Sequence, residues 1–191
     1  MRSERGPDTH RTTVQWMGEP VLTLADVWPQ RPRGVIVSLN STPTSVAAGH
    51  YHQGSLAQRQ LSRLADAGLF RAPEPGQTSF EDVAAEAGIG LADVVRRPTC
   101  AERHLIAREI EVGRRSLVVE LEARRVALLI CIFRRPVDVL LGTSGPPGFQ
   151  PRTTSWGARV FRLPGPFAPV QEVRGVMAEL TQALGSASSV Q

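Results

Sequence analysis

The chain contains no lysine. All 22 residues in the Lys+Arg count are arginine, against 18 acidic residues, which gives a formal net charge of +4 and an isoelectric point of about 10.3. Without a lysine amine no lysine Schiff base can form, so an enzyme that depends on one is excluded, and only the N-terminal amine could replace it. The basic surplus is compatible with a polyanionic partner, although a GC-rich genome explains arginine in place of lysine more simply.

Cysteine and histidine are also scarce. Cys100 and Cys131 are the two cysteines, too few for a four-cysteine iron–sulfur or zinc site. His50 and His52 stand two residues apart, as metal ligands can, but no third ligand lies near them in the sequence. We therefore expect neither a metal site nor a cofactor.

Long apolar runs are missing. None reaches the roughly 20 residues that a membrane span requires, and the first ten residues are polar and lack a secretory core. We therefore expect a cytoplasmic protein with no membrane partner. The 191 residues, 41% hydrophobic and 21% charged, predict a single domain over residues 1–191, with mobile polar tails at 1–10 and 185–191.

Short apolar segments alternate with amphipathic ones along the chain. The apolar segments predict strands, and the segments with helical spacing between them predict helices. This order is typical of parallel strands joined by right-handed crossovers. It predicts an α/β protein, a three-layer α/β/α sandwich with a four-stranded, mainly parallel sheet. The expected strands are 34–39, 91–95, 126–133 and 158–163, and the expected helices are 55–69, 101–125, 135–141 and 169–184.

Asn40 follows the first expected strand directly. In open α/β sheets, ligands bind at the carboxyl ends of the strands, where loops on a rigid scaffold carry binding and catalytic groups. An asparagine in this position also commonly caps the next helix or closes a turn. On residue type alone, the second interpretation is the more common one.

Three stretches resemble the mismatch-specific uracil/thymine DNA glycosylases, the Mug and thymine-DNA glycosylase branch of the uracil-DNA glycosylase superfamily. Residues 90–99, Gly-Leu-Ala-Asp-Val-Val-Arg-Arg-Pro-Thr, are the most specific match. Residues 24–29 lead to Asn40, where the family has Gly-Ile-Asn-Pro-Gly/Ser and this chain has Ser41 and Thr42 after the asparagine. Residues 162–167 stand where the family has Leu-Pro-Asn-Pro-Ser-Gly. In this chain Gly165 replaces the asparagine of that motif and Phe167 replaces its serine.

The resemblance implies a uracil-DNA glycosylase-like fold and a monofunctional DNA glycosylase. Such an enzyme hydrolyses the N-glycosidic bond of uracil or a mismatched pyrimidine in duplex DNA, in base excision repair, and acts as a monomer without a cofactor. The implied role of Asn40 is to orient the attacking water. Asp93 is expected at the same sheet edge, where it either assists that water or serves as a helix cap or a partner of Arg96 or Arg97.

The residues that would hold the base come next along the chain. Tyr51 or His52 stands where the family places an aromatic that stacks on the base. On residue type alone, a partly buried tyrosine that bonds to the backbone is the somewhat more common case. Backbone amides at Ser41 and around His50 would contact the pyrimidine carbonyls, and Gly49 would permit close approach.

DNA contacts are expected from two further segments. Arg96 and Arg97 follow the second strand, where their guanidinium groups would bind phosphates, although such arginine pairs are usually solvated surface. Phe167 would act as an apolar wedge in the duplex, beside Gly165. Two alternatives remain open: a catalytically inactive DNA-binding member of this fold, and a hydrolase that acts on the N-glycosidic bond of free nucleosides or nucleotides.

Overall fold

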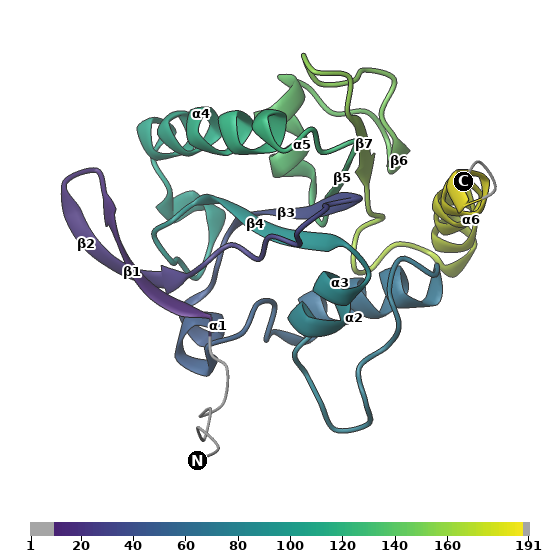
Figure 1. Ribbon diagram of the computed structural model, residues 1–191, viewed down its shortest axis with the longest axis horizontal. Helices are drawn as coiled ribbons and strands as arrows, with labels where there is room; N and C mark the ends of the chain where they lie inside the picture. Colours follow the sequence, from purple (N-terminus) through teal and green to yellow (C-terminus); the bar gives the residue numbers. More distant parts are fainter. Residues whose placement is uncertain (1–9, 189–191) are drawn as a thin grey trace.

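The computed structural model describes residues 10–188, in which helices cover both faces of a five-stranded sheet (Figure 1). The α/β class expected from the sequence is confirmed. The strand order is β4-β3-β5-β7-β6, with β3 (Gly34–Asn40), β4 (Ile89–Val95), β5 (Leu128–Cys131), β6 (Gly148–Phe149) and β7 (Arg159–Arg162). The helices are α1 (Pro43–Ala48), α2 (Ser55–Asp66), α3 (Glu81–Glu86), α4 (Ala107–Ala123), α5 (Arg134–Leu141) and α6 (Val170–Ser188).

The sheet has five strands, so the expectation of four was wrong. The four expected strands form and run parallel, as β3, β4, β5 and β7, but β6 pairs antiparallel with β7 and makes the sheet mixed. Because β6 has only two residues, it leaves no hydrophobic pattern in the sequence. It lies between the expected helix 135–141 and the expected strand 158–163, where no further strand was expected.

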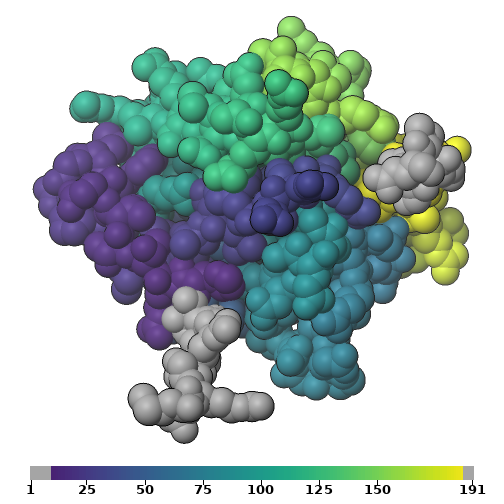
Figure 2. Space-filling view, in the orientation of Figure 1, coloured from purple at the N-terminus to yellow at the C-terminus, as the bar shows by residue number. Residues whose placement is uncertain are grey.

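A separate hairpin of β1 (Arg11–Trp16) and β2 (Glu19–Leu24) was also missed. It forms one side of the molecule in the space-filling view (purple, Figure 2). Within β1 only Trp16 is buried, and the other positions alternate between exposed and half-buried, so the strand has no apolar run. Its tight turn consists of Met17 and Gly18, both with positive φ (54° and 95°), as a two-residue hairpin turn requires.

The four expected helices form with different ends. The segment 101–125 gives only α4, because a short 3-10 turn (η1, Glu102–His104) precedes it. The last helix, α6, continues to residue 188 and so includes part of the expected C-terminal tail. Residues 1–9 and 189–191 lie outside the described part of the chain, so the tails are otherwise not described. Among residues 10–188, no helix is both long and apolar enough to cross a membrane.

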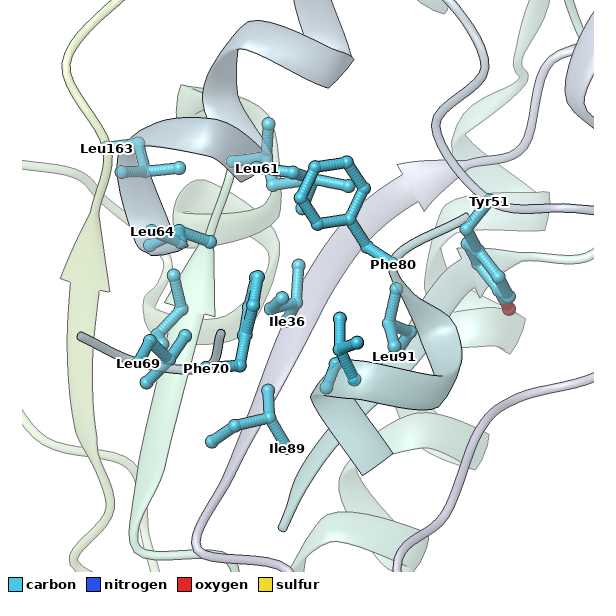
Figure 3. Packing of buried hydrophobic residues seen from close by; sticks show 14 of the residues in the cluster. Ile36, Tyr51, Leu61, Leu64, Leu69, Phe70, Phe80, Ile89, Leu91 and Leu163 are labelled. Carbon is cyan, nitrogen blue, oxygen red and sulfur yellow. The ribbon is translucent and has the colours of Figure 1, made fainter. Parts of the chain in front are cut away.

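Each face of the sheet carries its own hydrophobic core. Alternation along β3 directs Ile36 toward α2, α3 and α6, and Val35 and Val37 toward α4 and α5. Figure 3 shows the first core, where Leu61 and Leu64 of α2 pack near Ile36. The strands are therefore buried on both sides, which is why they appear in the sequence as continuous apolar runs.

The order in which strands are added to the sheet reverses at β3. From β3 the chain passes to β4 on one side, and later returns to β5 on the other side. Such a reversal in strand order opens a crevice at the carboxyl ends of the two central strands, here β3 and β5. Asn40 ends β3 at this point, and Phe133 follows β5 by two residues.

Candidate functional site

A cavity of about 460 Å³ lies at this crevice, within the range of small-ligand sites. The end of β3, the first turn of α2 and Phe133, two residues after β5, contribute to its wall. Of the expected site residues, it brings together Asn40, Ser41 and His52. The lining residues are Ser38, Leu39, Asn40, Ser41, Thr42, Ser45, His52, Gly54, Ser55, Leu56, Ala57, Cys100 and Phe133.

Asn40, the only asparagine of the chain, is held by its amide nitrogen. Nδ2 donates to the backbone carbonyls of Ser41 and Arg97, both at 3.1 Å, and to Thr99 Oγ1 at 2.9 Å. Carbonyl oxygens only accept hydrogen bonds, so the atom that faces them must be the nitrogen. The carbonyl oxygen Oδ1 accepts nothing from residues 10–188, which leaves it for a ligand or a water in the cavity.

Asp93 lies behind the cavity wall rather than in it. It pairs in register with Ser38, two residues before the end of β3, and is 2% exposed. Burial raises its pKa to about 7, and the charge of Asp26 contributes, against the opposing effects of the Ser41 hydrogen bond and of Arg96. The Ser41 hydroxyl donates to Asp93 Oδ2 at 2.5 Å. Ser41 therefore connects this carboxyl group to the cavity.

His52 is the histidine in the cavity wall. Its Nε2 lies 3.2 Å from Ser38 Oγ. Burial lowers the pKa of His52 to about 4, so the imidazole is neutral at pH 7. A neutral imidazole has one N–H donor and one acceptor nitrogen. The backbone of His52 adopts a left-handed conformation with φ 56°, which turns the chain from α1 toward α2.

Tyr51 does not line the cavity. It is 1% exposed and belongs to the core between the sheet and α2 and α3, at one side of the cluster in Figure 3. Its hydroxyl lies 3.5 Å from Asp26 Oδ1, and burial raises its pKa well above the ordinary value. Of Tyr51 and His52, only His52 lines the cavity. Gly49 and His50 lie outside the lining, and Gly49 ends α1 with φ 81°.

Arg96 and Arg97 are each paired with a carboxylate. Arg96 makes a two-pronged ion pair with Asp26, and Arg97 binds Glu109 through Nε at 2.6 Å and Nη2 at 2.8 Å. Asp26 and Glu109 are mostly buried, at 8% and 6% side-chain exposure. These pairs neutralise both guanidinium groups and hold the loop after β4 in place. We therefore do not assign phosphate binding to Arg96 or Arg97.

The loop after β7 is fastened to α2. Arg63 donates to the carbonyl oxygens of Pro164, Gly165 and Pro166, and Arg59 to that of Pro166. Carbonyl groups satisfy these donors without neutralising them, and neither arginine has a carboxylate partner among residues 10–188. Burial lowers the pKa of Arg63, and so does the nearby charge of Arg59. An uncompensated positive pair therefore lies on α2.

Phe167 follows this loop and is 79% exposed. It is the most exposed of the large hydrophobic residues between positions 10 and 188. The loop is bound to α2, and the first turn of α2 lines the cavity. Helix α2 therefore positions both Phe167 and one wall of the cavity. No side chain caps α2, so its first backbone N–H groups are free to bind an acceptor.

Phe133 is the aromatic residue of the cavity that the sequence analysis missed. It lines the cavity and is 39% exposed. Its position at the carboxyl end of the third expected strand, 126–133, was the available signal, because the rule that singled out Asn40 applies equally there. Leu56 and Cys100 were missed as well, since neither residue type is distinctive.

No protein-family model matches the chain, and no curated protein matches it. The resemblance to DNA glycosylases therefore stays a prediction.

Proposed function

We propose that this protein is a glycosylase that hydrolyses the N-glycosidic bond of a uracil or mismatched pyrimidine flipped out of DNA. The proposal rests on one observation: Asn40 lines the cavity at the crevice between β3 and β5, its amide nitrogen is held by three acceptors, and its carbonyl oxygen accepts no hydrogen bond from residues 10–188. The cavity is of suitable size for a nucleotide base and its sugar. The proposed fold is that of the uracil-DNA glycosylases.

Asn40 would act on the attacking water. Its Oδ1 accepts a hydrogen bond from the water, whose oxygen then attacks the anomeric carbon as the bond to the base nitrogen breaks. Because the amide is already oriented by Ser41, Arg97 and Thr99, no reorganisation is needed at the moment of reaction. An amide cannot take up the proton of the water, so another group must accept it.

Asp93 would accept that proton by way of Ser41. Its pKa of about 7 lies near the pH at which a general base works best. The Ser41 hydroxyl, at 2.5 Å from the carboxylate, passes a proton inward and receives one from the cavity side. This gives Asp93 the assisting role expected of it, through an intermediary.

His52 and Phe133 would hold the departing base. The base leaves with the electron pair of the broken bond, so negative charge builds on its carbonyl oxygens. The neutral His52 imidazole can donate its N–H to such an oxygen, much as an oxyanion hole does. Phe133 presents an aromatic surface at the cavity wall, and stacking of a base on it is worth about 1–3 kcal/mol.

The DNA strand would lie along α2 and the loop after β7. Arg59 and Arg63 carry uncompensated positive charge there and suit phosphates. Phe167, exposed beside them, suits the space that a flipped nucleotide leaves in the duplex. These residues replace Arg96 and Arg97 in the proposed DNA contact.

A single assay tests this function. A labelled duplex with uracil opposite guanine is incubated with the protein and then treated with alkali, which cleaves abasic sites. We expect strand scission, reduced about 10²–10³-fold in Asn40→Ala, with Thr99→Val as a milder variant that removes one acceptor of the amide. Selective ¹⁵N labelling of the single asparagine reports whether its side chain stays ordered in the second variant. Absence of scission with the wild-type protein, or full activity of Asn40→Ala, contradicts the proposal.

A hydrolase of free nucleosides is the second candidate. It is favoured by the ion pairs of Arg96 and Arg97, which leave less positive charge near Asn40 for a DNA backbone. Release of base from free nucleosides without scission of the duplex supports it. Salt-sensitive DNA binding with neither activity supports a protein that only binds DNA.

A further inference from the structure

Three side chains from distant parts of the sequence meet on the α1 side of the molecule. His10 precedes β1, His50 follows α1, and Glu81 is the first residue of α3. Each offers a ligand atom, and these atoms all lie within 4.8 Å of one another. The backbone of His10 is fixed there, because its N–H donates to the Gly49 carbonyl at 2.9 Å and its carbonyl accepts from Ala25 N–H at 2.7 Å. Figure 1 shows the start of β1 next to α1.

Lone pairs in this cluster are unused. Glu81 is 1% exposed, and its Oε2 has no hydrogen-bond partner. His50 Nδ1 is also buried and without a partner, at 3.6 Å from Glu81 Oε1. Only four buried side-chain polar atoms lack a partner in residues 10–188, and two of them are these. Buried polar groups are normally hydrogen-bonded, so two unsatisfied atoms in one place indicate that a further group binds there.

A ligand that satisfies these two atoms is expected to be a cation. A buried carboxylate is costly unless a cation pairs with it, and within the described chain the only cationic partner of Glu81 is His50. A protonated His50 would supply charge, but 3.6 Å is too long for the hydrogen bond that makes such a pair favourable. A cation bound by His50 Nδ1 and Glu81 Oε2 would satisfy both of these unpartnered atoms at once.

We propose that His10, His50 and Glu81 bind a divalent transition metal of the zinc type. Two imidazole nitrogens and one carboxylate form a known zinc ligand set, which leaves the fourth position to water. Ligands of a tetrahedral zinc lie roughly 3.3 Å apart, given metal–ligand distances of about 2.0–2.2 Å. His50 Nδ1 lies 3.6 Å from Glu81 Oε1, the other oxygen of the same carboxylate, and since the ligand atoms all lie within 4.8 Å of one another, no separation must shorten by more than about 1.5 Å. Half-buried His10 and His50 leave a path for the ion.

The carboxylate is already oriented for such a role. Tyr51 N–H donates to Glu81 Oε1, which leaves Oε2 as the free oxygen. Hydrogen bonds of this kind orient ligands in metal sites and strengthen binding. The metal would tie the segment before β1 to the α1–α2 loop and to α3, three pieces that the sequence alone does not bring together.

Zinc binding by the full 191-residue chain tests the proposal. The protein is freed of metal with a chelator, dialysed against Zn²⁺, and the bound metal is counted. We expect one Zn²⁺ per chain, a rise in Tm of about 5–10 °C at a hundredfold excess over Kd, and the visible spectrum of tetrahedral Co²⁺ on substitution. His10→Ala and His50→Ala should each weaken binding at least about tenfold and abolish the shift in Tm.

Control variants isolate the site from other metal ligands. His104→Ala and Cys100→Ser remove the exposed histidine and thiol that lie elsewhere, and both should bind Zn²⁺ with wild-type affinity. Glu81→Gln should also lose binding, and if that variant fails to fold, the half-buried His10 still decides the question. No stoichiometric zinc in the wild-type chain, unchanged affinity in His10→Ala, or loss of binding in Cys100→Ser overturns the proposal.

Discussion

Replacement of Asp93 by asparagine tests the electrostatics behind the cavity. Burial raises the pKa of this carboxyl group from its ordinary 3.8 to about 7, with a further rise from Asp26. The Ser41 hydrogen bond and Arg96 act in the opposite direction but do not restore the ordinary value. The folded protein therefore favours the neutral form of Asp93, whereas the unfolded chain ionises it at low pH.

The sign of the pH dependence follows from this shift. Between about pH 4 and pH 7 the folded state holds a proton that the unfolded state has released, so stability decreases as the pH rises. The contribution of neutral Asp93 to the free energy of unfolding is fully present below about pH 3.8 and is lost as the pH rises through about 7. The gap between the two pKa values corresponds to about 4 kcal/mol, of which about 2–3 kcal/mol falls between roughly pH 5 and pH 8.

An asparagine side chain cannot titrate, so Asp93→Asn removes this dependence. Urea unfolding of both proteins between pH 5 and pH 8 should show the wild type losing about 2–3 kcal/mol relative to the variant, with no further loss above that range. The amide lacks a partner where Asp93 Oδ1 lacks one, which adds a constant cost of about 1–3 kcal/mol at every pH. Only the change of the free energy of unfolding with pH therefore reports on the titration of Asp93.

The control is Glu122→Gln, which removes an exposed carboxylate and should leave the slope near that of the wild type. A difference between wild type and Asp93→Asn that does not change with pH would refute the reasoning, because it would mean that Asp93 is charged in the folded protein throughout. If Asp93 is also the base, kcat/KM of the wild type rises through an apparent pKa near 7, and Asp93→Asn lacks that rise.

Three further outcomes are expected. Gly113→Ala in α4 should lower the free energy of unfolding by more than about 3 kcal/mol, because its Cβ would overlap the Val94 carbonyl oxygen, whereas Gly175→Ala in α6, which has open space around it, should change it by less than about 1 kcal/mol. Phe133→Ala should raise KM for the base-containing substrate about tenfold, as steady-state kinetics would measure. Arg63→Gln should reduce the salt dependence of DNA affinity by about one charge in fluorescence anisotropy, and an unchanged slope would argue against DNA along α2.

The central strands could be predicted because burial on both faces leaves apolar runs. The edge elements could not: β1 alternates exposed and half-buried residues, and β6 has only two residues. The helices α1 and α3 have six residues each, too few for a helical period to emerge. Tertiary packing, rather than local pattern, determines these elements.

The candidate site could be predicted where it depends on strand ends. Asn40 was found by its place after a strand, and Phe133 would have been found by the same rule. Partners distant in sequence could not be found, since Asp26 reaches Arg96 across 70 positions. Two adjacent arginines look like a phosphate site until the folded chain supplies a carboxylate to each.

Three consecutive residues join the two proposed sites. His50 belongs to the metal cluster, Tyr51 fills the core with its ring while its N–H binds Glu81, and His52 lines the cavity. A metal that fixes His50 and Glu81 therefore also fixes the chain that carries His52. Affinity linkage between two sites is reciprocal, so a ligand that orders His52 in the cavity should tighten zinc binding by the same factor by which zinc tightens binding of that ligand. Equal zinc affinity with and without an occupied cavity would show that Tyr51, held in the core, separates the two sites rather than coupling them.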